Sequence, residues 1–200
     1  IMRKSIAFLG LGWVLLSACT TAKKLVVAQD GSGNYQTVQA AFDAIPANNK
    51  RPFTILVKNG VYKEKLYLDS TRNRITLVGE DKFRTILTYD DHSGKRAPSG
   101  ETIHTGTSYS FLAAGNDFTA KNLTIENSAG NSAGQAVAMH TLGDRILFED
   151  CRFLGHQDVL LTGRPGARHY FTNCYIEGTT DFIFGPSIAW FEDCHINSKR

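Results

Sequence analysis

The sequence has few cysteines, few prolines and no long run of charged or apolar residues. Four cysteines in 200 residues are too few for a disulfide-rich scaffold. No block of five like charges occurs, so nothing indicates nucleic-acid binding. The apolar run from Ser5 to Leu16 is too short for a membrane span. Eighteen glycines against five prolines instead indicate many tight turns between short elements.

What remains is the composition of a globular protein. Hydrophobic residues make up 42% of the chain and charged residues 20%, which excludes a disordered or fibrous protein. A chain of 200 residues is long enough for one domain with a sizeable core. Without Arg3 and Lys4, 20 basic residues oppose 19 acidic ones, so the net charge of the folded part is close to zero.

The first residues have the layout of a secretory signal. Arg3 and Lys4 precede the apolar run, and the following Leu-Ser-Ala-Cys sequence, Leu16 to Cys19, resembles a bacterial lipobox. We therefore predict a lipoprotein signal peptide over residues 1–18, lipidation of Cys19, a tether over 19–24 and a domain over 25–200. This places the protein in the bacterial cell envelope, as an outer-membrane or periplasmic lipoprotein held only by its lipid. An ordinary cleaved signal, and hence a secreted protein, is the alternative.

A strand-sized repeat organises the second half of the chain. Four segments each have a polar pair, then apolar residues two positions apart, then a turn residue, which is typical of short strands. They are Lys121–Asn127, Glu149–Gly155, Thr172–Gly178 and Glu192–Ser198. Their third residues, Leu123, Cys151, Cys174 and Cys194, follow one another at intervals of 28, 23 and 20 residues.

These intervals leave little room for the crossover helices of a doubly wound α/β fold. Leucine-rich repeats are the rival solenoid, but their regular leucine pattern is missing. We therefore predict an all-β fold, a parallel β-helix in which each coil pairs with the next. A short amphipathic helix beginning after Thr37 and ending before Pro46 would close the first open coil.

Two aspartates recur in register with this repeat. Asp158 lies seven residues after Cys151, and Asp181 lies seven residues after Cys174. Equivalent positions on successive coils stack about 4.8 Å apart, so the two carboxyl groups are expected to be close neighbours. Mutual repulsion would raise the pKa of one of them, and the pair could then supply a general acid and a nucleophile. The alternative is a pair of turn-forming aspartates that face water.

Two glutamines accompany the aspartates. Gln157 adjoins Asp158, and Gln135 lies twelve residues after Leu123 in a coil five residues longer than the next. If the extra residues fall within Ser128–Gly134, Gln135 shares the phase of the aspartates. The two amides could then donate hydrogen bonds to an oxyanion. An amide ladder that satisfies the backbone of the turns is the alternative.

These residues resemble the pectin methylesterases, carbohydrate esterases that remove methyl esters from homogalacturonan. The matching stretches occur in the family's order: Gln29–Tyr35, Gly60–Glu64, Gly134–Ala138, Gly155–Asp158 and Thr180–Gly185. The resemblance implies a right-handed parallel β-helix and a carboxylic ester hydrolase that releases methanol from pectin. The partner would be the methyl-esterified polysaccharide, with no nucleic acid and no cofactor, and the protein is expected to be a monomer.

Carried over position by position, the resemblance implies a role for each site residue. Asp181 would be the nucleophile and Asp158 the general acid and later the base, while Gln135 and Gln157 would form the oxyanion site. Phe182 could face the cleft as a platform for a sugar ring, or pack inward. No metal is expected, because the six histidines are scattered without the spacing of a zinc site.

The sequence also departs from the family's pattern. Val159 and Leu161 stand where the family frequently has Thr and Tyr, and His140 stands where an Arg is common. These changes keep open an envelope esterase acting on a different ester. A non-catalytic carbohydrate-binding β-helix is a further alternative. A β-helix polysaccharide lyase would need clustered carboxylates and a basic residue, which are not found.

The family has a further stretch, Gly-Arg-Pro-Trp, whose Arg orients the nucleophile. Gly163 and Arg164 begin a similar stretch, but Gly166 follows the proline and the position is too early. Because Ile1 also precedes the Met and the chain stops inside a repeat, we expect an incomplete open reading frame. The 200 residues alone are accordingly expected to release little or no methanol from pectin.

Overall fold

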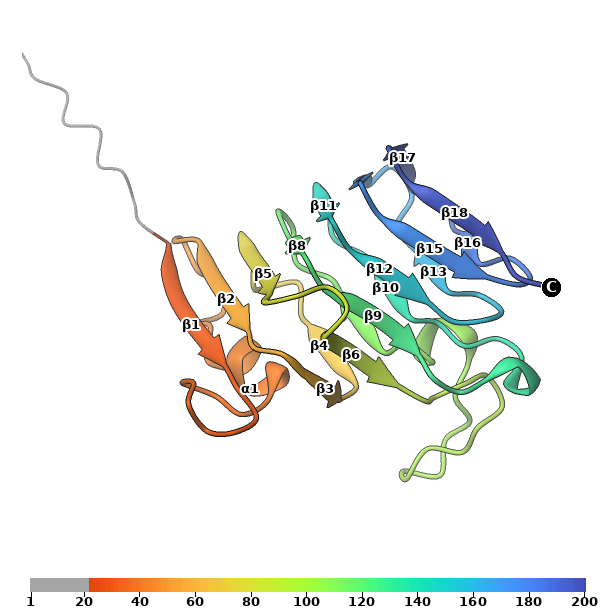
Figure 1. Ribbon diagram of the computed structural model, residues 1–200, viewed down its shortest axis with the longest axis horizontal. Coiled ribbons are helices and arrows are strands. Elements are labelled where there is room, and N and C mark those ends of the chain that lie inside the picture. The colour runs from red at the N-terminus through yellow and green to blue at the C-terminus, as the bar shows by residue number, and fades with distance from the viewer. Residues whose placement is uncertain (1–21) are drawn as a thin grey trace, which may run out of the picture.

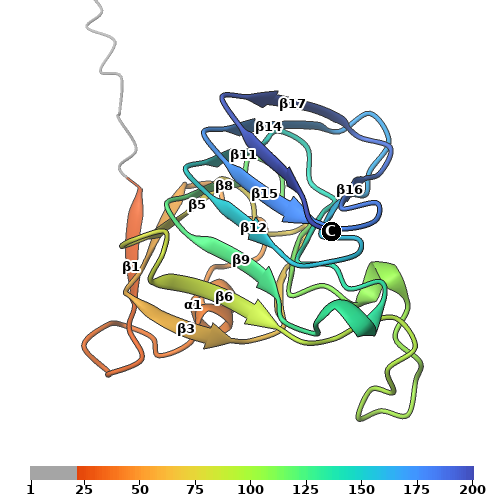
Figure 2. The ribbon, with the colours of Figure 1, turned by 45° about the vertical axis from the view of Figure 1, so that its right-hand side comes forward.

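Three parallel β-sheets run along the molecule, as Figures 1 and 2 show for this computed structural model. The structure describes residues 22–200, so Cys19 and the predicted signal peptide lie outside the described residues. The five complete coils each pass through one strand of each of the three sheets, called A, B and C, while β1 precedes them and β17 and β18 follow them. The predicted all-β parallel β-helix is confirmed.

Sheet A has seven strands, in the order β1 (Lys23–Val27), β2 (Phe53–Val57), β5 (Ile75–Gly79), β8 (Thr119–Lys121), β11 (Ile146–Glu149), β14 (Arg168–Thr172) and β17 (Ile188–Glu192). Sheet B has six, in the order β3 (Gly60–Lys63), β6 (Thr85–Tyr89), β9 (Thr124–Asn127), β12 (Arg152–Leu154), β15 (Tyr175–Gly178) and β18 (His195–Ser198). Sheet C has five, in the order β4 (Leu66–Leu68), β7 (Phe111–Ala113), β10 (Met139–Thr141), β13 (Leu160–Thr162) and β16 (Ile183–Phe184). Strand β1 includes Lys23 and Lys24, which were predicted to lie in the tether.

The sequence repeat corresponds to sheet B. Thr124 pairs with Arg152, Arg152 with Tyr175, and Tyr175 with His195. The residues just before these partners are therefore Leu123 and the three cysteines, in the predicted register. Cys151 and Cys174 are buried, Cys194 is half-buried, and all three are free thiols.

A left-handed residue turns the chain from sheet A into sheet B in four successive coils. These residues are Asn122, Asp150, Asn173 and Asp193, with φ of 54°, 55°, 53° and 51°. Each is the second member of the polar pair in the repeat. Asn and Asp tolerate this backbone conformation better than other residues with a side chain, which explains why the pair recurs.

The core lies inside the stack and is built from inward-facing residues of all three sheets. Strands β2 and β5 alternate buried and half-buried residues along their whole length, as period-two strands require. Aromatic rings continue the stacking from coil to coil, with Phe171 lying 5.0 Å from Phe148 and 4.7 Å from Phe191 between ring centroids. The ladder fixes the coils in register and thereby positions the loops at their edges.

Helix α1 (Val38–Asp43) covers the core at the N-terminal end of the stack (Figure 1). The Thr37 side chain accepts a hydrogen bond from the Ala40 amide, as an N-cap does, and Phe42 stacks on Phe111 at 5.5 Å. Glu64 accepts hydrogen bonds from two further amides of the first turn, those of residues 38 and 39. Glu64 therefore holds the capping helix in place.

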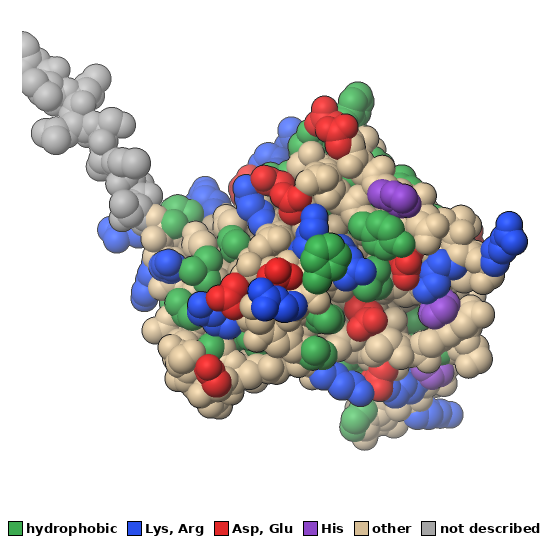
Figure 3. Space-filling view, in the orientation of Figure 1, with side chains coloured by type: hydrophobic (Ala, Val, Ile, Leu, Met, Phe, Trp, Pro, Cys, Tyr) green, Lys and Arg blue, Asp and Glu red, His purple; other side chains and the backbone are tan. Residues whose placement is uncertain are grey.

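Basic and acidic side chains are intermixed on the face that contains sheet B (Figure 3). Ion pairs join neighbouring coils there, such as Lys63–Asp90 at 2.9 Å, and Lys82–Asp150 at 3.6 Å spans the coil between them. Because these pairs are solvent-exposed, each contributes little to stability. Among residues 22–200, no helix is both long and apolar enough to cross a membrane.

Candidate active site

The two predicted aspartates stand at the same place in successive coils, two residues before a strand of sheet C. Leu160 of β13 pairs with Ile183 of β16, and counting back two residues on each strand sets Asp158 opposite Asp181. The ladder extends to this position, because the Asp158 amide donates to the Thr180 carbonyl oxygen at 3.1 Å. The structure therefore brings the two carboxyl groups together on neighbouring coils.

Both aspartates have left-handed backbones, with φ of 67° at Asp158 and 48° at Asp181. This feature alone does not mark a catalytic residue, because eight other residues with side chains share it within residues 22–200. They are Asn48, Arg74, Asp117, Asn122, Arg145, Asp150, Asn173 and Asp193. The left-handed backbone is turn geometry, so the surroundings of the carboxyl groups must separate a catalytic pair from ordinary turn residues.

Burial differs sharply between the two carboxyl groups. Asp158 is 2% exposed, whereas Asp181 is exposed. Burial raises the pKa of Asp158, and the neighbouring charge of Asp181 raises it further, while hydrogen bonds with the side chains of Gln135 and Gln157 act in the opposite direction. The buried carboxyl is thus suited to hold a proton, and the exposed carboxylate is accessible to a substrate. Two turn aspartates that simply face water would not include a carboxyl group as buried as that of Asp158.

The two glutamines lie side by side on neighbouring coils. A parallel bridge joins Gln135 to Gln157, and the Ala136 amide donates to the Gln157 carbonyl oxygen at 3.1 Å. Gln135 therefore pairs with the residue before Asp158, one position away from the alignment that the sequence suggested. The reason is that more residues of this coil lie in the loop than the five assumed. Both amides nevertheless lie near enough to Asp158 to lower the pKa of its carboxyl group.

A loop that the sequence did not predict holds the Gln135 side chain. Thr105, in the 3₁₀ turn η1 (Thr105–Thr107), donates its hydroxyl hydrogen to Gln135 Oε1 at 2.7 Å. The Ser93 amide donates to the Gln135 carbonyl oxygen at 2.8 Å. With Oε1 engaged by Thr105, the Nε2 hydrogens of Gln135 are free to point toward Asp158. Thr105 belongs to no repeat, so no periodic signal in the sequence pointed to it.

The outer face of sheet C beside the aspartates is largely apolar. In the strand pairing, His140 lies next to both Leu112 and Leu161, and Leu161 lies next to Phe184. Burial lowers the pKa of His140, and its Nδ1 lies 3.0 Å from the Gly106 carbonyl oxygen. Leu112, His140, Leu161 and Phe184 thus form a largely apolar row across sheet C. Two of the three departures from the family's pattern, His140 and Leu161, lie in this row.

Two other predicted positions face the interior. Val159 is completely buried, so this departure cannot touch a substrate directly. Phe182 is half-buried and packs against the core cluster, while its carbonyl oxygen accepts from the Leu160 amide at 2.9 Å. Its role as a platform for a sugar ring stays a prediction. Over the part of the chain that the structure describes, no three His, Cys, Asp or Glu side chains gather as a metal site would require.

Comparison with known proteins places this arrangement in a family. The family model described as pectinesterase matches residues 24–200. Pectinesterase 31 of Arabidopsis thaliana is 41% identical over 183 residues, which cover 90% of this chain and 57% of that protein. The chain therefore spans little more than half the length of this curated relative.

Solved structures agree with the sequence matches. The pectin methylesterase from carrot superposes with a TM-score of 0.80 at 36% identity, covering 90% of this chain and 54% of the other. A pectin methylesterase in complex with a hexasaccharide superposes with a TM-score of 0.79 at 33% identity, covering 90% of this chain and 56% of the other. The stack of three parallel sheets is thus shared with enzymes of known structure.

Proposed function

This chain belongs to the pectinesterase family, a family of carboxylic ester hydrolases, and from that premise we propose that the whole protein removes methyl esters from pectin and releases methanol. The observation that carries the proposal is the unequal carboxyl pair. Asp158 is buried with a raised pKa, and the exposed Asp181 lies opposite it on the next coil. No metal is needed, because a proton donor and a nucleophile are both present in the pair.

The first half of the reaction forms an acyl-enzyme. A carboxylate oxygen of Asp181 attacks the carbonyl carbon of the methyl ester, and the electron pair of the carbonyl moves onto its oxygen. Amide hydrogens of Gln135 and Gln157 stabilise that oxyanion. When the tetrahedral intermediate collapses, the carbon–methoxy bond breaks, and the leaving oxygen takes the proton of Asp158 and departs as methanol.

The second half restores the enzyme. Asp158, now ionised, accepts a proton from a water molecule whose oxygen attacks the acyl carbon. The bond to Asp181 breaks, and the polysaccharide is released with a free carboxyl group. Asp158 is protonated again, so the cycle can repeat. The apolar row that includes Leu161 offers a surface for the methyl ester beside the reacting atoms.

Methanol release from methyl-esterified homogalacturonan by the whole protein tests the proposal. The predicted result is stoichiometric release of methanol and free carboxylate, with no methanol from demethylated polygalacturonate. Hydrolysis of acetyl esters, without attack on methyl esters, would favour the non-pectin esterase. Binding of the polysaccharide without release of methanol would favour the non-catalytic module.

Loss of the oxyanion amide is expected to slow the reaction without weakening the fold. Gln157 is only partly buried, so Gln157→Ala removes the donor at little cost in packing. We expect kcat to fall by about 10²- to 10³-fold, the magnitude found when one oxyanion donor is removed from a serine protease. Steady-state kinetics on pectin check this, with Asn197→Ala on the solvent side of sheet B as the control. An unchanged kcat for Gln157→Ala would remove this residue from the mechanism.

We also propose that Cys19 is lipidated and anchors the protein in a bacterial envelope. The support is the cationic start, the apolar run and the Leu-Ser-Ala-Cys sequence. Incorporation of a labelled fatty acid into the protein, expressed with its leader in a Gram-negative host, is expected for the unmodified sequence. Cys19→Ser is expected to abolish it. Equal labelling of both would contradict lipidation at this residue.

A further inference from the structure

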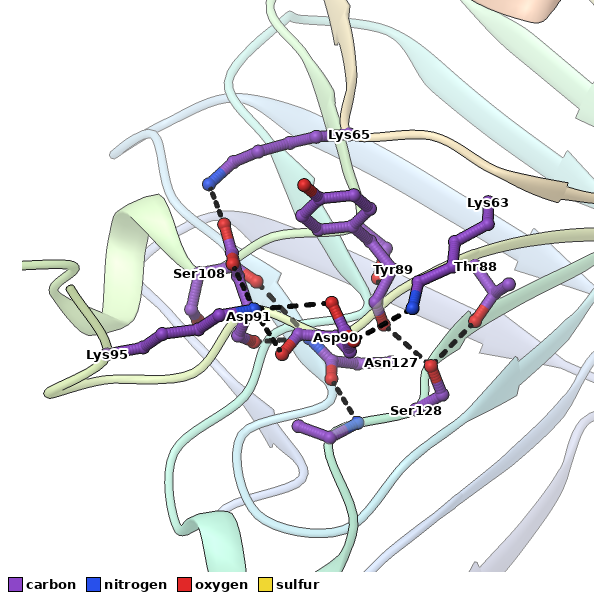
Figure 4. A network of polar contacts seen from close by, with 12 residues as sticks. Lys63, Lys65, Thr88, Tyr89, Asp90, Asp91, Lys95, Ser108, Asn127 and Ser128 are labelled. Atoms are coloured by element: carbon purple, nitrogen blue, oxygen red, sulfur yellow. Dashed lines mark hydrogen bonds and ion pairs between the residues drawn. The ribbon is translucent and has the colours of Figure 1, made fainter. Parts of the chain in front are cut away.

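Asn127 is a buried polar residue that no step of the reaction uses. It ends strand β9 and is 3% exposed. Its amide nitrogen Nδ2 lies 2.9 Å from the carbonyl oxygen of Asp91 and 3.2 Å from that of Ser108 (Figure 4). The same nitrogen lies 3.0 Å from the carbonyl oxygen of Val137. Its Oδ1 accepts from the Ala129 amide at 3.0 Å. One side chain thus ties together three segments distant in sequence.

These three segments are the ones that meet at Gln135. Two residues after Asp91, the Ser93 amide donates to the Gln135 carbonyl oxygen. Three residues before Ser108, the Thr105 hydroxyl donates to Gln135 Oε1. Val137 itself follows Gln135 by two residues. The hydrogen bonds that Ser93 and Thr105 donate to Gln135 therefore each have an anchor on Asn127 within three residues.

The neighbours of Asn127 strengthen the same connection. The buried Ser108 hydroxyl oxygen accepts from the Val137 amide at 3.0 Å and donates to the Thr105 carbonyl oxygen at 2.7 Å. Asp91 is also buried and forms ion pairs with Lys65 at 2.5 Å and Lys95 at 2.9 Å (Figure 4). Burial by itself raises the pKa of Asp91, but the hydrogen bonds from the two lysines outweigh it and lower the pKa. The segment that begins at Asp91 is therefore fixed at its base.

Comparison with the following coils shows that the Asn127 side chain supports the loop before Gln135 and is not needed for the stacking of the coils. In the two following coils, the position of Asn127 is occupied by Gly155 and Gly178. A Cβ atom at Gly155 would lie 2.9 Å from a methyl group of Val159, so those coils leave no room for a side chain. Only the coil that carries the long loop to Gln135 has an amide here.

We propose that Asn127 is a positioning residue that holds the Gln135 amide in the orientation needed to stabilise the oxyanion, an inference that rests on the proposed esterase function. Asn127 does not contact the reacting atoms. It acts through the carbonyl groups of the three segments, whose displacement would turn the Gln135 amide away from the reacting carbonyl.

Asn127→Ala in the whole protein tests the proposal, with Asn49→Ala as its matched control. Asn49 is also a buried amide, 8% exposed, that donates to two carbonyl oxygens, those of Arg51 and Asn73, but it lies near the N-terminal end of the stack. We expect Asn127→Ala to lower kcat on pectin by about 10- to 100-fold with little change in KM. Asn49→Ala is expected to lose thermal stability but to keep its kcat. Equal kcat values for both variants would overturn the proposal.

A double-mutant cycle separates positioning from general loosening of the fold. If Asn127 acts through Gln135, then adding Asn127→Ala to a Gln135→Ala protein lowers kcat no further. A further loss equal to that of the single variant would contradict the proposal. Should Asn127→Ala fail to fold, Ser108→Ala breaks the same connection with a smaller change. The same dependence on Gln135 is expected for it, and its absence counts against the proposal.

A readout that needs no activity distinguishes failure of this inference from failure of the proposed function. The side-chain amide signals of Gln135 can be followed by NMR in each variant. In Asn127→Ala they are expected to move toward the positions of a solvent-exposed glutamine, and in Asn49→Ala to stay where they are. Unchanged signals in Asn127→Ala would refute the positioning role even if the wild type released no methanol. A wild type without activity but with the expected shifts would refute the esterase function alone.

Discussion

Replacing Asp181 by asparagine is expected to lower methanol release from pectin by about 10⁴-fold or more, because the variant has lost its nucleophile. The side chain is exposed and its backbone is left-handed with φ of 48°, a conformation that Asn tolerates as well as Asp. The fold should therefore be unchanged. Steady-state methanol assays measure the loss, and binding of pectin by the inactive variant is expected to persist.

Asp193→Asn is the matched control for this substitution. Asp193 is likewise an exposed aspartate with a left-handed backbone, φ 51°, but it lies at a corner between sheets A and B. Activity within about twofold of the wild type is expected, since exposed substitutions away from a site have small effects. An Asp181→Asn protein as active as Asp193→Asn would show that another residue attacks the ester.

Replacing Asp158 by asparagine is expected to remove the proton donor and lower kcat by about 10²- to 10⁴-fold, the range for loss of a general acid–base group. The same substitution is expected to stabilise the protein at neutral pH. Asp158 is 2% exposed, and both burial and the Asp181 charge raise its pKa. An ionised carboxylate therefore costs stability at this position, whereas a neutral amide of the same shape does not.

The pH dependence of this stabilisation follows from the direction of the pKa shift. Because the pKa is raised on folding from 3.8, the folded state binds the proton of Asp158 more tightly than the unfolded state. The proton on Asp158 therefore stabilises the wild-type fold. This contribution is complete at pH values below the unfolded pKa and is lost as pH rises through the folded pKa. Asp158→Asn should thus melt above the wild type at pH 7, by on the order of a few degrees. The difference should shrink as the pH falls toward 3.8. A variant that melts below the wild type at pH 7 would contradict the account.

The sequence predicted sheet B in register because one residue makes the corner before it. The distance from Asn122, Asp150 and Asn173 to the following strand never varies, so the pattern repeats without a shift. Sheet A was not recognised as a separate sheet, because β8, β11, β14 and β17 are each followed by a strand of sheet B after only two residues. Strands of sheet C, such as β10 and β13, have only three residues, too few for a recognisable alternation.

The candidate site was predictable only where the segment that leads from sheet B to sheet C has the same length in neighbouring coils. Seven residues separate Cys151 from Asp158 and Cys174 from Asp181, so the spacing alone set the aspartates side by side. Gln135 follows a loop whose extra residues the sequence could not assign to a place, and its expected alignment was wrong by one position. Contacts between distant segments, such as that of Thr105 with Gln135, have no periodicity and required the structure. The sequence held one signal for Asn127: the equivalent positions in the next two coils are glycines.

The most direct test of the account is the titration of the Asp158 carboxyl group, followed by carbon NMR in the wild type and in Asp181→Asn. The central claim is that carboxyl groups on successive coils are close enough for the charge of one to raise the pKa of the other. We expect the pKa of Asp158 to lie above 3.8 in the wild type and to fall when residue 181 is neutral. The same pKa in both proteins would show that the two groups do not interact, and the proposed acid and nucleophile could not work as a pair.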